Sequence, residues 1–327
     1  MKRAALQIWR HAMFIRQLNY LVTLAKEQHF ARAAELCNVT QPALSSAIRS
    51  LENELGLVIV RRGRRFLGLT EEGERVLGWA RQTIAALDHM RQDVSASNLL
   101  SGTVRIGVIP TTMPVVSMLI ATCREAHPML SFAVRSLSSD AILRQLDDYE
   151  LDIGFTYLDD HTQAGFEVLS LYRERYVLVS PSGAGESVCS GVGRWDALGD
   201  LKFGLLDSSM QNRQVINAAF RRAGVQPKVV LEADSLLTLI SNVQHAGLHT
   251  VLPHSVLSVM NSTQRDAVTA LEPELTREIG LIARDLPSRP PLVAALWKAA
   301  NHLDLQSSFD AFLDSPRTLA EASTDAS

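Results

Sequence analysis

The sequence predicts a mixed α/β protein with a small, all-α N-terminal domain, a long connecting helix and a larger C-terminal domain of two α/β lobes. Three observations support this fold class. The chain has 327 residues, and at about 150 residues per domain this length corresponds to about two domains. Apolar residues recur at helical spacing up to about residue 100. Beyond residue 101, short apolar runs alternate with helical patterns, which is typical of parallel sheets covered by helices.

Composition and charge indicate a globular protein with a basic N-terminal end. Hydrophobic residues make up 46% of the chain, which is enough for an ordinary core. Residues 1–70 contain eleven Lys and Arg against four Asp and Glu, a net charge of about +7. The other residues carry 21 basic and 31 acidic side chains, and the whole chain has a net charge of −3. A basic head suits phosphate binding, and an acidic body limits non-specific adhesion.

The cellular location follows from what the sequence lacks. No apolar run approaches the ~20 residues of a membrane span, and the N-terminus has no apolar signal-peptide segment. Three cysteines, Cys37, Cys123 and Cys189, are odd in number and far apart, which is typical of a reducing cytosol. We therefore expect a cytoplasmic protein with no membrane partner. For the segment before the first patterned helix, we expect either that Met13 is the true start or that residues 1–13 form a loose extension.

Residues 28–52 read QHFARAAELCNVTQPALSSAIRSLE and predict two short helices joined by a tight turn. Asn38 suits a left-handed turn position, because its short polar side chain tolerates a positive φ. Thr40 is the expected N-cap of the second helix, and Pro42 fits its first turn, where amide groups lack partners. The buried face of that helix should hold the residues spaced at intervals of four, three and four, namely Leu44, Ile48, Leu51 and Leu55.

The outer face of the second helix is polar. Small hydroxyls, an amide and one Arg supply donors and acceptors for base edges, together with a phosphate clamp. A helix-turn-helix places its second helix in the DNA major groove, so we expect double-stranded DNA as a partner. The expected contacts are Thr40, Gln41, Pro42, Ser45, Ser46 and Arg49. For this pattern alone, the alternative is a solvated helix on an unrelated protein.

A cluster of arginines follows the helix-turn-helix. It lies between two apolar segments, Val58–Val60 and Phe66–Leu67, where a short hairpin with Gly63 at its tip is expected. A hairpin of this kind can bring Arg side chains to phosphates or to a narrow minor groove. The expected DNA contacts therefore also include Arg61, Arg62, Arg64 and Arg65. The alternative is a solvated run of charges.

The run from Phe14 to Gly73 resembles the winged helix-turn-helix of LysR-type transcriptional regulators, and the resemblance extends to the end of the chain. It rests on Phe30, Ala33, Ala34, Leu36, Gln41, Pro42, Ser45, Ile48, Leu51, Glu52, Leu55, Gly56, Arg62, Leu69, Thr70 and Gly73. Three positions depart from the family pattern. His29 stands where Ser is usual, Ile59 and Val60 replace Leu-Phe, and Ser46 occupies a position that is often basic. The last departure suggests that DNA affinity depends more strongly on the arginines of the hairpin.

The resemblance implies a division of the chain into an N-terminal extension, a DNA-binding domain, a linker and dimerisation helix, an effector-binding domain and a disordered tail, at 1–13, 14–73, 74–100, 101–315 and 316–327. The helical rhythm from Glu71 to about Leu100 agrees with a long amphipathic helix, whose apolar stripe must be buried against another surface. In the family this helix pairs with its twin; the alternative is packing on its own body domain. The implied partners are a second copy in a dimer or tetramer, DNA with an interrupted inverted repeat, and RNA polymerase as a further candidate.

A ligand between two α/β lobes should lie at the carboxyl ends of strands and the starts of helices. The polar residues at such places are Thr111, Thr112, Ser138, Ser139, Asn212, Arg213 and His249. Hydroxyls and helix N-termini favour anions, so we expect a small carboxylate or a similar anion as the effector. The alternatives are that His249 points to water from its turn and that Arg213 lies on a helix surface.

Other classes of function fit less well. The sequence has no Gly-rich phosphate loop with Lys and no Cys or His pair at metal spacing, so we expect no enzyme activity, catalytic residue, cofactor or metal. A thiol redox-responsive regulator of the same architecture is the alternative function, and its thiols would be Cys123 and Cys189. Cys123 falls on the apolar side of a predicted helix, which favours a buried, inert thiol. A passive DNA architectural protein would have no use for a two-lobed body.

Overall fold

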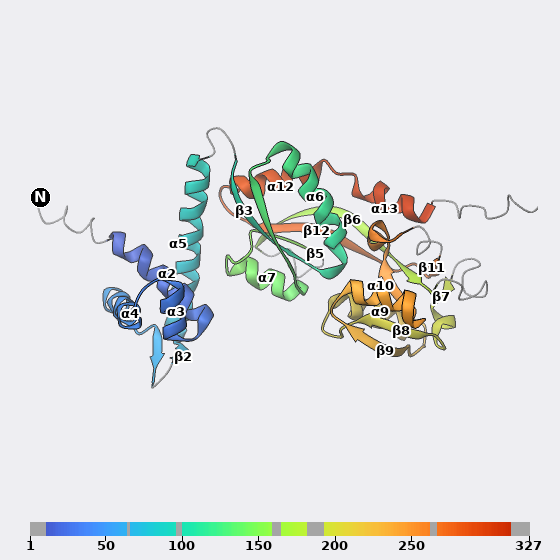
Figure 1. Cartoon of the computed structure of the whole chain (residues 1–327), viewed down its shortest axis with the longest axis horizontal. Coiled ribbons are helices and arrows are strands. Elements are labelled where there is room, and N and C mark those ends of the chain that lie inside the picture. Colours follow the sequence, from blue (N-terminus) through green and yellow to red (C-terminus); the bar gives the residue numbers. More distant parts are fainter. Residues whose placement is uncertain are drawn as a thin grey trace, which may run out of the picture. The chain divides into compact units, whose positions relative to one another are not determined.

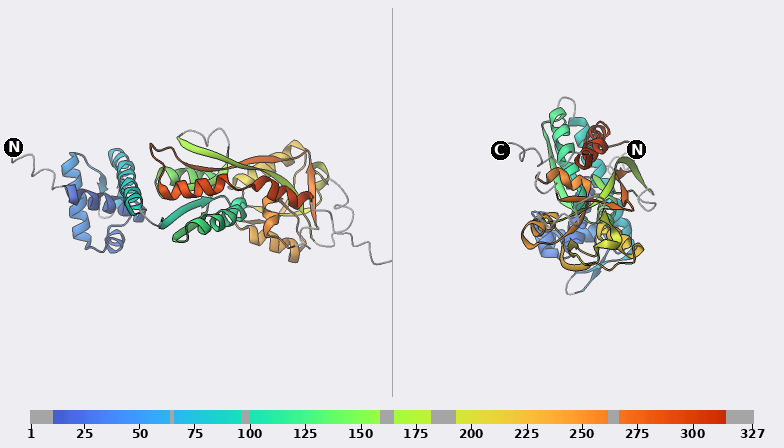
Figure 2. Two further views of the ribbon diagram at one scale, coloured as in Figure 1. Left: turned by 90° about the horizontal axis from the view of Figure 1, so that it is seen from above. Right: turned by 90° about the vertical axis from the view of Figure 1, so that its right-hand side faces the viewer.

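The structure is a computed structural model that describes residues 11–63, 66–95, 100–158, 165–181, 193–261 and 267–314. The chain divides into two compact units, Met1–Ser97 and Asn98–Ser327. Figures 1 and 2 show a mainly helical first unit and a second unit in which helices pack on strands.

The N-terminal unit is a helical core with a small hairpin. Its described elements are α2 (His11–Glu27), α3 (Phe30–Leu36), α4 (Gln41–Leu55), β1 (Val60–Arg62), β2 (Phe66–Leu69) and α5 (Glu71–Ser95). The core includes Leu21 and Leu24 of α2, Ala33 of α3 and Ile48 of α4, all of them fully buried. Small residues on α3 allow the helices to approach one another closely.

The turn between α3 and α4 has the predicted chemistry. Asn38 adopts a φ of 53°, and the Thr40 hydroxyl accepts a hydrogen bond from the N–H of Ala43 at 3.4 Å. Leu44, Ile48 and Leu51 are buried as expected, whereas Leu55 is 39% exposed. The prediction of a buried Leu55 was therefore wrong, because α4 ends there, before Gly56 at a φ of 69°.

The β1–β2 hairpin is tied to the helices by side-chain hydrogen bonds. Glu52 of α4 accepts the N–H groups of Ile59 and Val60 at 2.9 and 3.0 Å. The Thr70 hydroxyl donates to the carbonyl of Val58 at 2.6 Å and accepts the N–H of Gly73 at 2.9 Å, which caps α5. A Cβ at Gly73 would lie 2.2 Å from the carbonyl oxygen of Ile59, so only glycine allows this approach.

Helix α5 buries one side against its own unit. Leu77 and Ala80 belong to the N-terminal core, and α5 contacts α2. Trp79 and Met90 are 69% and 55% exposed, so part of the helix's apolar surface lies uncovered in the single chain. The prediction extended this helix to about Leu100; residues 96–99 lie outside the described part of the chain.

The first lobe of the C-terminal unit contains parallel strands covered by helices. Its elements are β3 (Gly102–Val108), η1 (Pro110–Thr112), α6 (Met113–Ala126), β4 (Leu130–Ser136), α7 (Ser139–Asp147), β5 (Ile153–Tyr157) and α12 (Pro291–Asn301). Strand β3 pairs in parallel with both β4 and β5. Ile106, Phe155 and Leu296 are among its fully buried core residues.

The second lobe repeats this plan around a second parallel pair. Its elements are β7 (Gly193–Arg194), η2 (Trp195–Leu198), β8 (Lys202–Leu206), α9 (Gln211–Arg222), β9 (Lys228–Ala233), α10 (Leu236–Ala246), β10 (Thr250–Pro253), η3 (His254–Val259) and β11 (Val268–Glu272). Strands β8 and β9 are parallel. The main chain of His249 joins β8 to β10, because it accepts the N–H of Gly204 at 2.9 Å and donates to the carbonyl of Lys202 at 2.8 Å.

The lobes are connected by β6 (Phe166–Val179) and β12 (Thr276–Arg284). These two strands pair antiparallel up to Arg175, and the last residues of β6 pair antiparallel with β10 and β11 instead. In Figure 1, β6 runs from the first lobe into the second. The expected parallel pairs are present in both lobes, but the main sheet as a whole is mixed, in the order β4-β3-β5-β12-β6-β11-β7.

Several elements of the C-terminal unit were not predicted as such. The segment Phe166–Val179 forms one long strand, β6, that continues through its charged centre. Strand β11 and the C-terminal helix α13 (Leu305–Asp314) were not predicted. Glu174, at the charged centre of β6, is buried together with its neighbours Tyr172 and Tyr176.

Candidate functional site

The outer face of α4 is a polar surface held in place by the core beneath it. Gln41, Pro42, Ser46 and Arg49 are exposed, and Ser45 is half-buried. Thr40 is also exposed, while its hydroxyl caps the helix. His29, the departure from the family pattern, caps α3 by accepting the N–H of Arg32 at 3.4 Å. It therefore performs the capping task that a Ser would perform.

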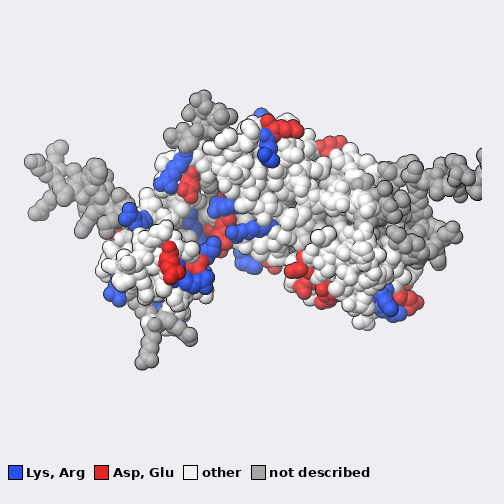
Figure 3. Space-filling model, viewed as in Figure 1, with Lys and Arg blue, Asp and Glu red and all other residues white. Residues whose placement is uncertain are grey.

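The described part of the hairpin contains two of the four predicted arginines, Arg61 and Arg62. Arg61 is exposed on β1. Arg62 ends β1 and pairs with Phe66 in the hairpin register, while Arg64 and Arg65 lie outside the described residues. On the face drawn in Figure 3, Lys and Arg side chains are scattered over the N-terminal unit, whereas a large area of the C-terminal unit carries neither sign of charge.

Buried polar side chains from both lobes meet around β6. We call this group the interlobe cluster, and it consists of Thr111, Tyr157, Tyr172, Glu174, Tyr176, Asn212 and Ser255. None of the seven is more than 4% exposed. The hydroxyls of Tyr157 and Tyr176 lie 3.1 Å apart, and the amide of Asn212 donates to the Tyr176 hydroxyl at 3.3 Å. The Ser255 hydroxyl donates to the carbonyl of Thr111 at 3.4 Å.

The topology explains why these residues meet. Thr111 follows β3 in η1 and Tyr157 ends β5, so both lie at the carboxyl edge of the first lobe's parallel strands. Asn212 lies in the first turn of α9, which follows β8 in the second lobe. Tyr172, Glu174 and Tyr176 alternate along β6, and side chains two residues apart point to the same face of a strand.

Electrostatics at the cluster are dominated by burial. Loss of hydration raises the pKa of Glu174 to about 8, although the hydroxyls of Tyr176, Thr111 and Tyr172 and the charge of Arg277 lower it. Burial also raises the pKa values of the cluster's tyrosines. Near neutral pH the cluster is therefore mostly uncharged, and its tyrosine and threonine hydroxyls are available as donors.

A pocket of about 710 Å³ lies between the lobes, next to the η1 and η3 segments that also carry Thr111 and Ser255 of the cluster. It is lined by side chains that include Pro110, Met113 and Ser136 of the first lobe and Ser235, Leu236 and Val256 of the second. Pro110 and Val256 are the chain neighbours of Thr111 and Ser255, so the pocket and the cluster share the η1 and η3 segments.

Two of the predicted effector residues, Thr111 and Asn212, thus belong to one cluster. Two others, Thr112 and Ser138, bond within their own segments, and Ser139 lies beside one of them. The Thr112 hydroxyl donates to the carbonyl of Ile109 at 3.0 Å, and Ser138 caps α7 by accepting the N–H of Ala141 at 3.4 Å. Ser139 is buried beside that cap, and its hydroxyl has no hydrogen-bond partner among the described residues.

Arg213 and His249 are occupied inside the second lobe. The Arg213 guanidinium donates to the carbonyl of Leu206 at 2.8 Å and forms an ion pair with Glu232 at 2.9 Å. The Nδ1 of His249 lies 3.1 Å from the Ser180 hydroxyl. Burial lowers the pKa of His249, which favours its neutral form. Neither side chain presents a positive charge to the interlobe cluster.

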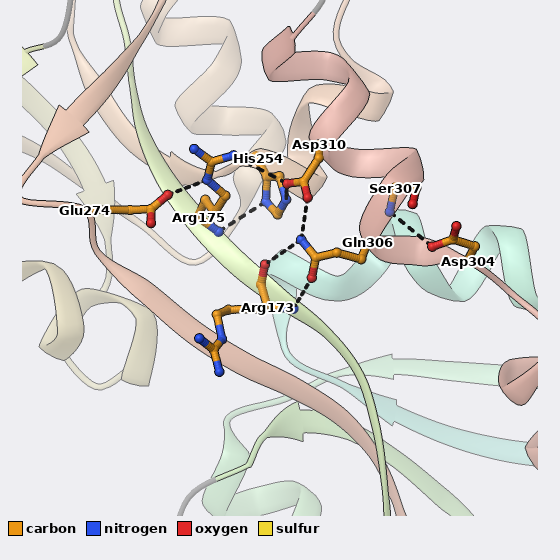
Figure 4. Close-up of polar contacts among 8 residues, drawn as sticks. All are labelled: Arg173, Arg175, His254, Glu274, Asp304, Gln306, Ser307 and Asp310. Atoms are coloured by element: carbon orange, nitrogen blue, oxygen red, sulfur yellow. Dashed lines mark hydrogen bonds and ion pairs between the residues drawn. The ribbon is translucent and has the colours of Figure 1, made fainter.

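Along its edge, β6 is held by the C-terminal helix α13 (Figure 4). The side-chain amide of Gln306 accepts the N–H of Arg173 at 2.8 Å and donates to Asp310 at 2.9 Å. The Nε2 of His254 lies 3.3 Å from Asp310, and its Nδ1 accepts the N–H of Arg175 at 3.2 Å. We call these five residues the α13 latch.

Charge in the α13 latch is only partly buried. Arg175 also pairs with Glu274 and lies 3.6 Å from Asp310. His254 is fully buried, and burial lowers its pKa although Asp310 opposes this effect. The rings of Tyr172 and His254 both approach Phe309 of α13, with centroids 5.0 and 5.8 Å away. The latch therefore lies next to the interlobe cluster, with the Tyr172 ring in contact with both.

The sequence-based search missed Tyr157, Tyr172, Glu174, Tyr176 and Ser255. A signal was present for three of them, because the segment Tyr172–Tyr176 reads YRERY and places its tyrosines and glutamate on one face of an extended chain. Within the described part of the chain there is no group of His, Cys, Asp and Glu that could hold a metal ion. The described helices include none that is long and apolar enough to span a bilayer.

Comparison with known proteins matches both units. Residues 15–74 match the family described as bacterial regulatory helix-turn-helix protein, lysR family, and residues 97–303 match the LysR substrate binding domain. The DNA-binding transcriptional dual regulator OxyR of Escherichia coli (strain K12) is 32% identical over 277 residues, which cover 83% of this chain and 90% of OxyR. The regulator EstR of Acinetobacter baylyi is 31% identical over 307 residues, covering 92% and 95%.

Solved structures agree on the fold. A full-length OxyR variant from Pseudomonas aeruginosa has a TM-score of 0.69 at 24% identity, covering 90% of this chain and 96% of that one. Full-length CbnR in complex with its target DNA has a TM-score of 0.61 at 18% identity, covering 88% and 98%. From the matches to both units, the chain belongs to the LysR family of DNA-binding transcriptional regulators, which bind small-molecule effectors and form oligomers.

Proposed function

We propose that this chain is a cytoplasmic, sequence-specific regulator that reads an interrupted inverted repeat as a dimer or tetramer and responds to a small acidic effector. The proposed organisation is DNA binding by residues 14–73, dimerisation through 74–100 and effector binding by 101–315, with RNA polymerase as a candidate partner. The observation that carries the DNA-binding part is α4, whose apolar face is fully buried while its polar face is exposed.

The proposed DNA contacts are those of the recognition helix and the hairpin. Gln41, Ser45 and Ser46 would read base edges, and Arg49 would bind phosphate. Two subunits on one face of DNA require half-sites about one helical turn apart, or a multiple of it. Arg61, the hairpin arginine whose side chain the structure describes, has the exposure that a phosphate contact requires.

The proposed effector site is the interlobe cluster with its adjoining pocket. Thr111 and Asn212 follow strands of different lobes and meet through tyrosine hydroxyls, as a ligand that bridges the lobes requires. The acidic character of the effector is supported by the abundance of hydroxyl donors and by the N-termini of α6 and α9. Because Arg213 and His249 are occupied elsewhere, hydrogen bonds rather than an ion pair would hold the anion.

Fluorescence anisotropy with the DNA upstream of the chain's own gene tests this function. The expected result is a preference of ~10³-fold or more over a shuffled duplex at two salt concentrations. Arg49→Ala should weaken this binding. Arg222→Ala, which removes an exposed arginine of the C-terminal unit, is the matched control and should leave it unchanged. Equal binding of both duplexes by the wild-type protein would contradict sequence-specific regulation at this site.

A thiol-based regulator is the second candidate, because several relatives bear the name hydrogen peroxide-inducible genes activator. In this chain Cys123 is buried in α6 and its pKa is raised by burial, which disfavours the reactive thiolate. Cys189 lies outside the described residues. DNA binding of the oxidised and reduced protein, compared with that of Cys123→Ser and Cys189→Ser, distinguishes the two candidates: a redox effect that either substitution abolishes would favour the thiol mechanism.

A further inference from the structure

The interlobe cluster contains several buried polar atoms that lack a hydrogen bond of good geometry. Neither carboxyl oxygen of Glu174 makes a hydrogen bond of good geometry, and the same holds for the hydroxyls of Thr111 and Tyr172 and the side-chain oxygen of Asn212. Buried polar groups nearly always have partners, because an unsatisfied one is costly. Four such residues in one cluster indicate a site that is built to receive a polar molecule.

Glu174 lies at the centre of this site. It is fully buried between Tyr172 and Tyr176 on β6, and the hydroxyl of Thr111 approaches it from η1. The charged group that acts on it from the neighbouring strand is Arg277 of β12, which is opposite Glu174 in the strand register. The Arg277 guanidinium lies 5.7 Å from the centre of the Tyr157 ring.

The remaining titratable groups near β6 belong to other contacts. Tyr157 of β5 faces the cluster and interacts with Glu174. From η3 and α13, His254 and Asp310 face each other on the latch side, as does Arg175 of β6 itself. The charge of Arg277 opposes the effect of burial on Glu174 but does not outweigh it, and the pKa of Glu174 is raised to about 8. The carboxyl is therefore protonated in the neutral range.

An ionised Glu174 and an acidic effector would compete for the same donors. The hydroxyls of Tyr172, Tyr176 and Thr111 are the groups that stabilise the Glu174 carboxylate. They are also the donors that an effector carboxylate would need. Two negative charges in one buried site repel each other strongly, so the cluster can hold one or the other.

We propose that the interlobe cluster binds its acidic effector only while Glu174 carries a proton, which it donates in a hydrogen bond to an effector oxygen. This inference rests on the proposed function, and it describes how protonation of Glu174 regulates effector binding. At a pH where Glu174 is ionised, each bound anion takes up one proton from solvent onto the Glu174 carboxylate. No proton moves to the effector, and no bond other than the O–H bond of Glu174 forms.

The resting protonation state can be tested on the full chain without any effector. Infrared difference spectra should show the C=O stretch of a protonated carboxyl at pH 7, and this band should disappear as the pH rises through about 8. Glu174→Gln should lack the band. Glu278→Gln, which removes an exposed carboxyl from the neighbouring strand, should retain it. Absence of the band from the wild-type protein at pH 6 would overturn the proposal, independently of whether any variant folds.

Calorimetry with acetate, succinate and benzoate, and with acetamide as the uncharged isostere of acetate, tests the coupling. Above about pH 8 the affinity for an acid should fall about tenfold per pH unit in the wild-type protein and stay level in Glu174→Gln. A level acid affinity in the wild-type protein between pH 6 and 9 would overturn the coupling. If methylamine bound instead, and more tightly at high pH, Glu174 would be an ionised counter-ion and the proposal would fail. If the carboxyl band were present but no acid bound, the acidic effector of the proposed function would be overturned. This outcome differs from that of an ionised Glu174, which would leave no band.

Discussion

Helix α4 and the crossing strand β6 both carry polar side chains, but α4 exposes them whereas β6 buries them. On α4 the core residues Leu44 and Ile48 hold the helix, so its outer residues are free to contact a partner. On β6 the polar residues Tyr172 and Glu174 are themselves part of the packed interior. A substitution on the exposed face of α4 should therefore change binding without changing stability, whereas a substitution of a buried polar residue on β6 should change both.

The largest effect is expected behind β6. Phe309 of α13 is fully buried against Tyr172 and His254, so Phe309→Ala should lower the free energy of unfolding of the C-terminal unit by about 3–5 kcal/mol. Urea unfolding followed by circular dichroism measures this loss. Met129→Ala, at a residue that is 58% exposed, should change it by less than about 0.5 kcal/mol. Equal effects of the two substitutions would mean that α13 does not pack on β6.

Glu174→Gln should raise stability at pH 8 by a few kcal/mol, on the order of 2–4. The folded protein keeps a proton up to about pH 8 that the unfolded chain releases above its ordinary pKa of 4.5. Wild-type stability should therefore fall as the pH rises between these values, and Glu174→Gln should remove that part of the fall. Urea midpoints at pH 4.5 and pH 8 provide the measurement. A gap between the two proteins that is the same at both pH values would contradict the buried, protonated carboxyl.

On α4 the same kind of change should affect binding alone. Arg49→Ala is expected to weaken DNA binding about tenfold, near 1.4 kcal/mol, and to flatten the salt dependence by about one phosphate contact. Thermal unfolding should be unchanged, because the Arg49 side chain is exposed. A change in the preferred sequence without a change in salt slope would reassign Arg49 from phosphate to base contact.

Thr40 lies next to the exposed face of α4, yet a substitution there should affect stability. Its hydroxyl caps α4, so Thr40→Ala should cost about 1 kcal/mol of stability in the N-terminal unit. Thr40→Ser keeps the cap and should restore that stability. DNA affinity measured for both variants then shows whether the Thr40 hydroxyl also reaches DNA, since only a direct contact would leave Thr40→Ser with a binding defect that its stability does not explain.

Sequence reasoning was accurate where local chemistry decides the conformation. The left-handed Asn38, the Thr40 cap and the buried face of α4 depend on residues a few positions apart. The partners of Arg213 could not be predicted in this way, because Glu232 lies on a different element, β9, and only the fold brings them together.

Sequence reasoning missed the central residues of the interlobe cluster. A strand with Arg-Glu-Arg at its centre is typical of a solvent-facing segment, and charged residues are rarely buried without a partner. Only the three-dimensional arrangement shows that Glu174 is buried beside Thr111 and Tyr176, and that Asn212 of the second lobe contacts Tyr176. The local sequence pattern thus identified Thr111 and Asn212, one from each lobe, but not the residues of β6 that lie between them.

The bond between Gln306 and the main chain of Arg173 has a further consequence. In the first lobe, β6 is the last strand of its half of the sheet, paired with β12 on one side. An exposed strand edge is a template on which another chain can pair and aggregate. The Gln306 amide occupies the main-chain N–H of Arg173 at that edge, and α13 lies over it. A chain cut before Leu305 would therefore be expected to lose solubility as well as stability.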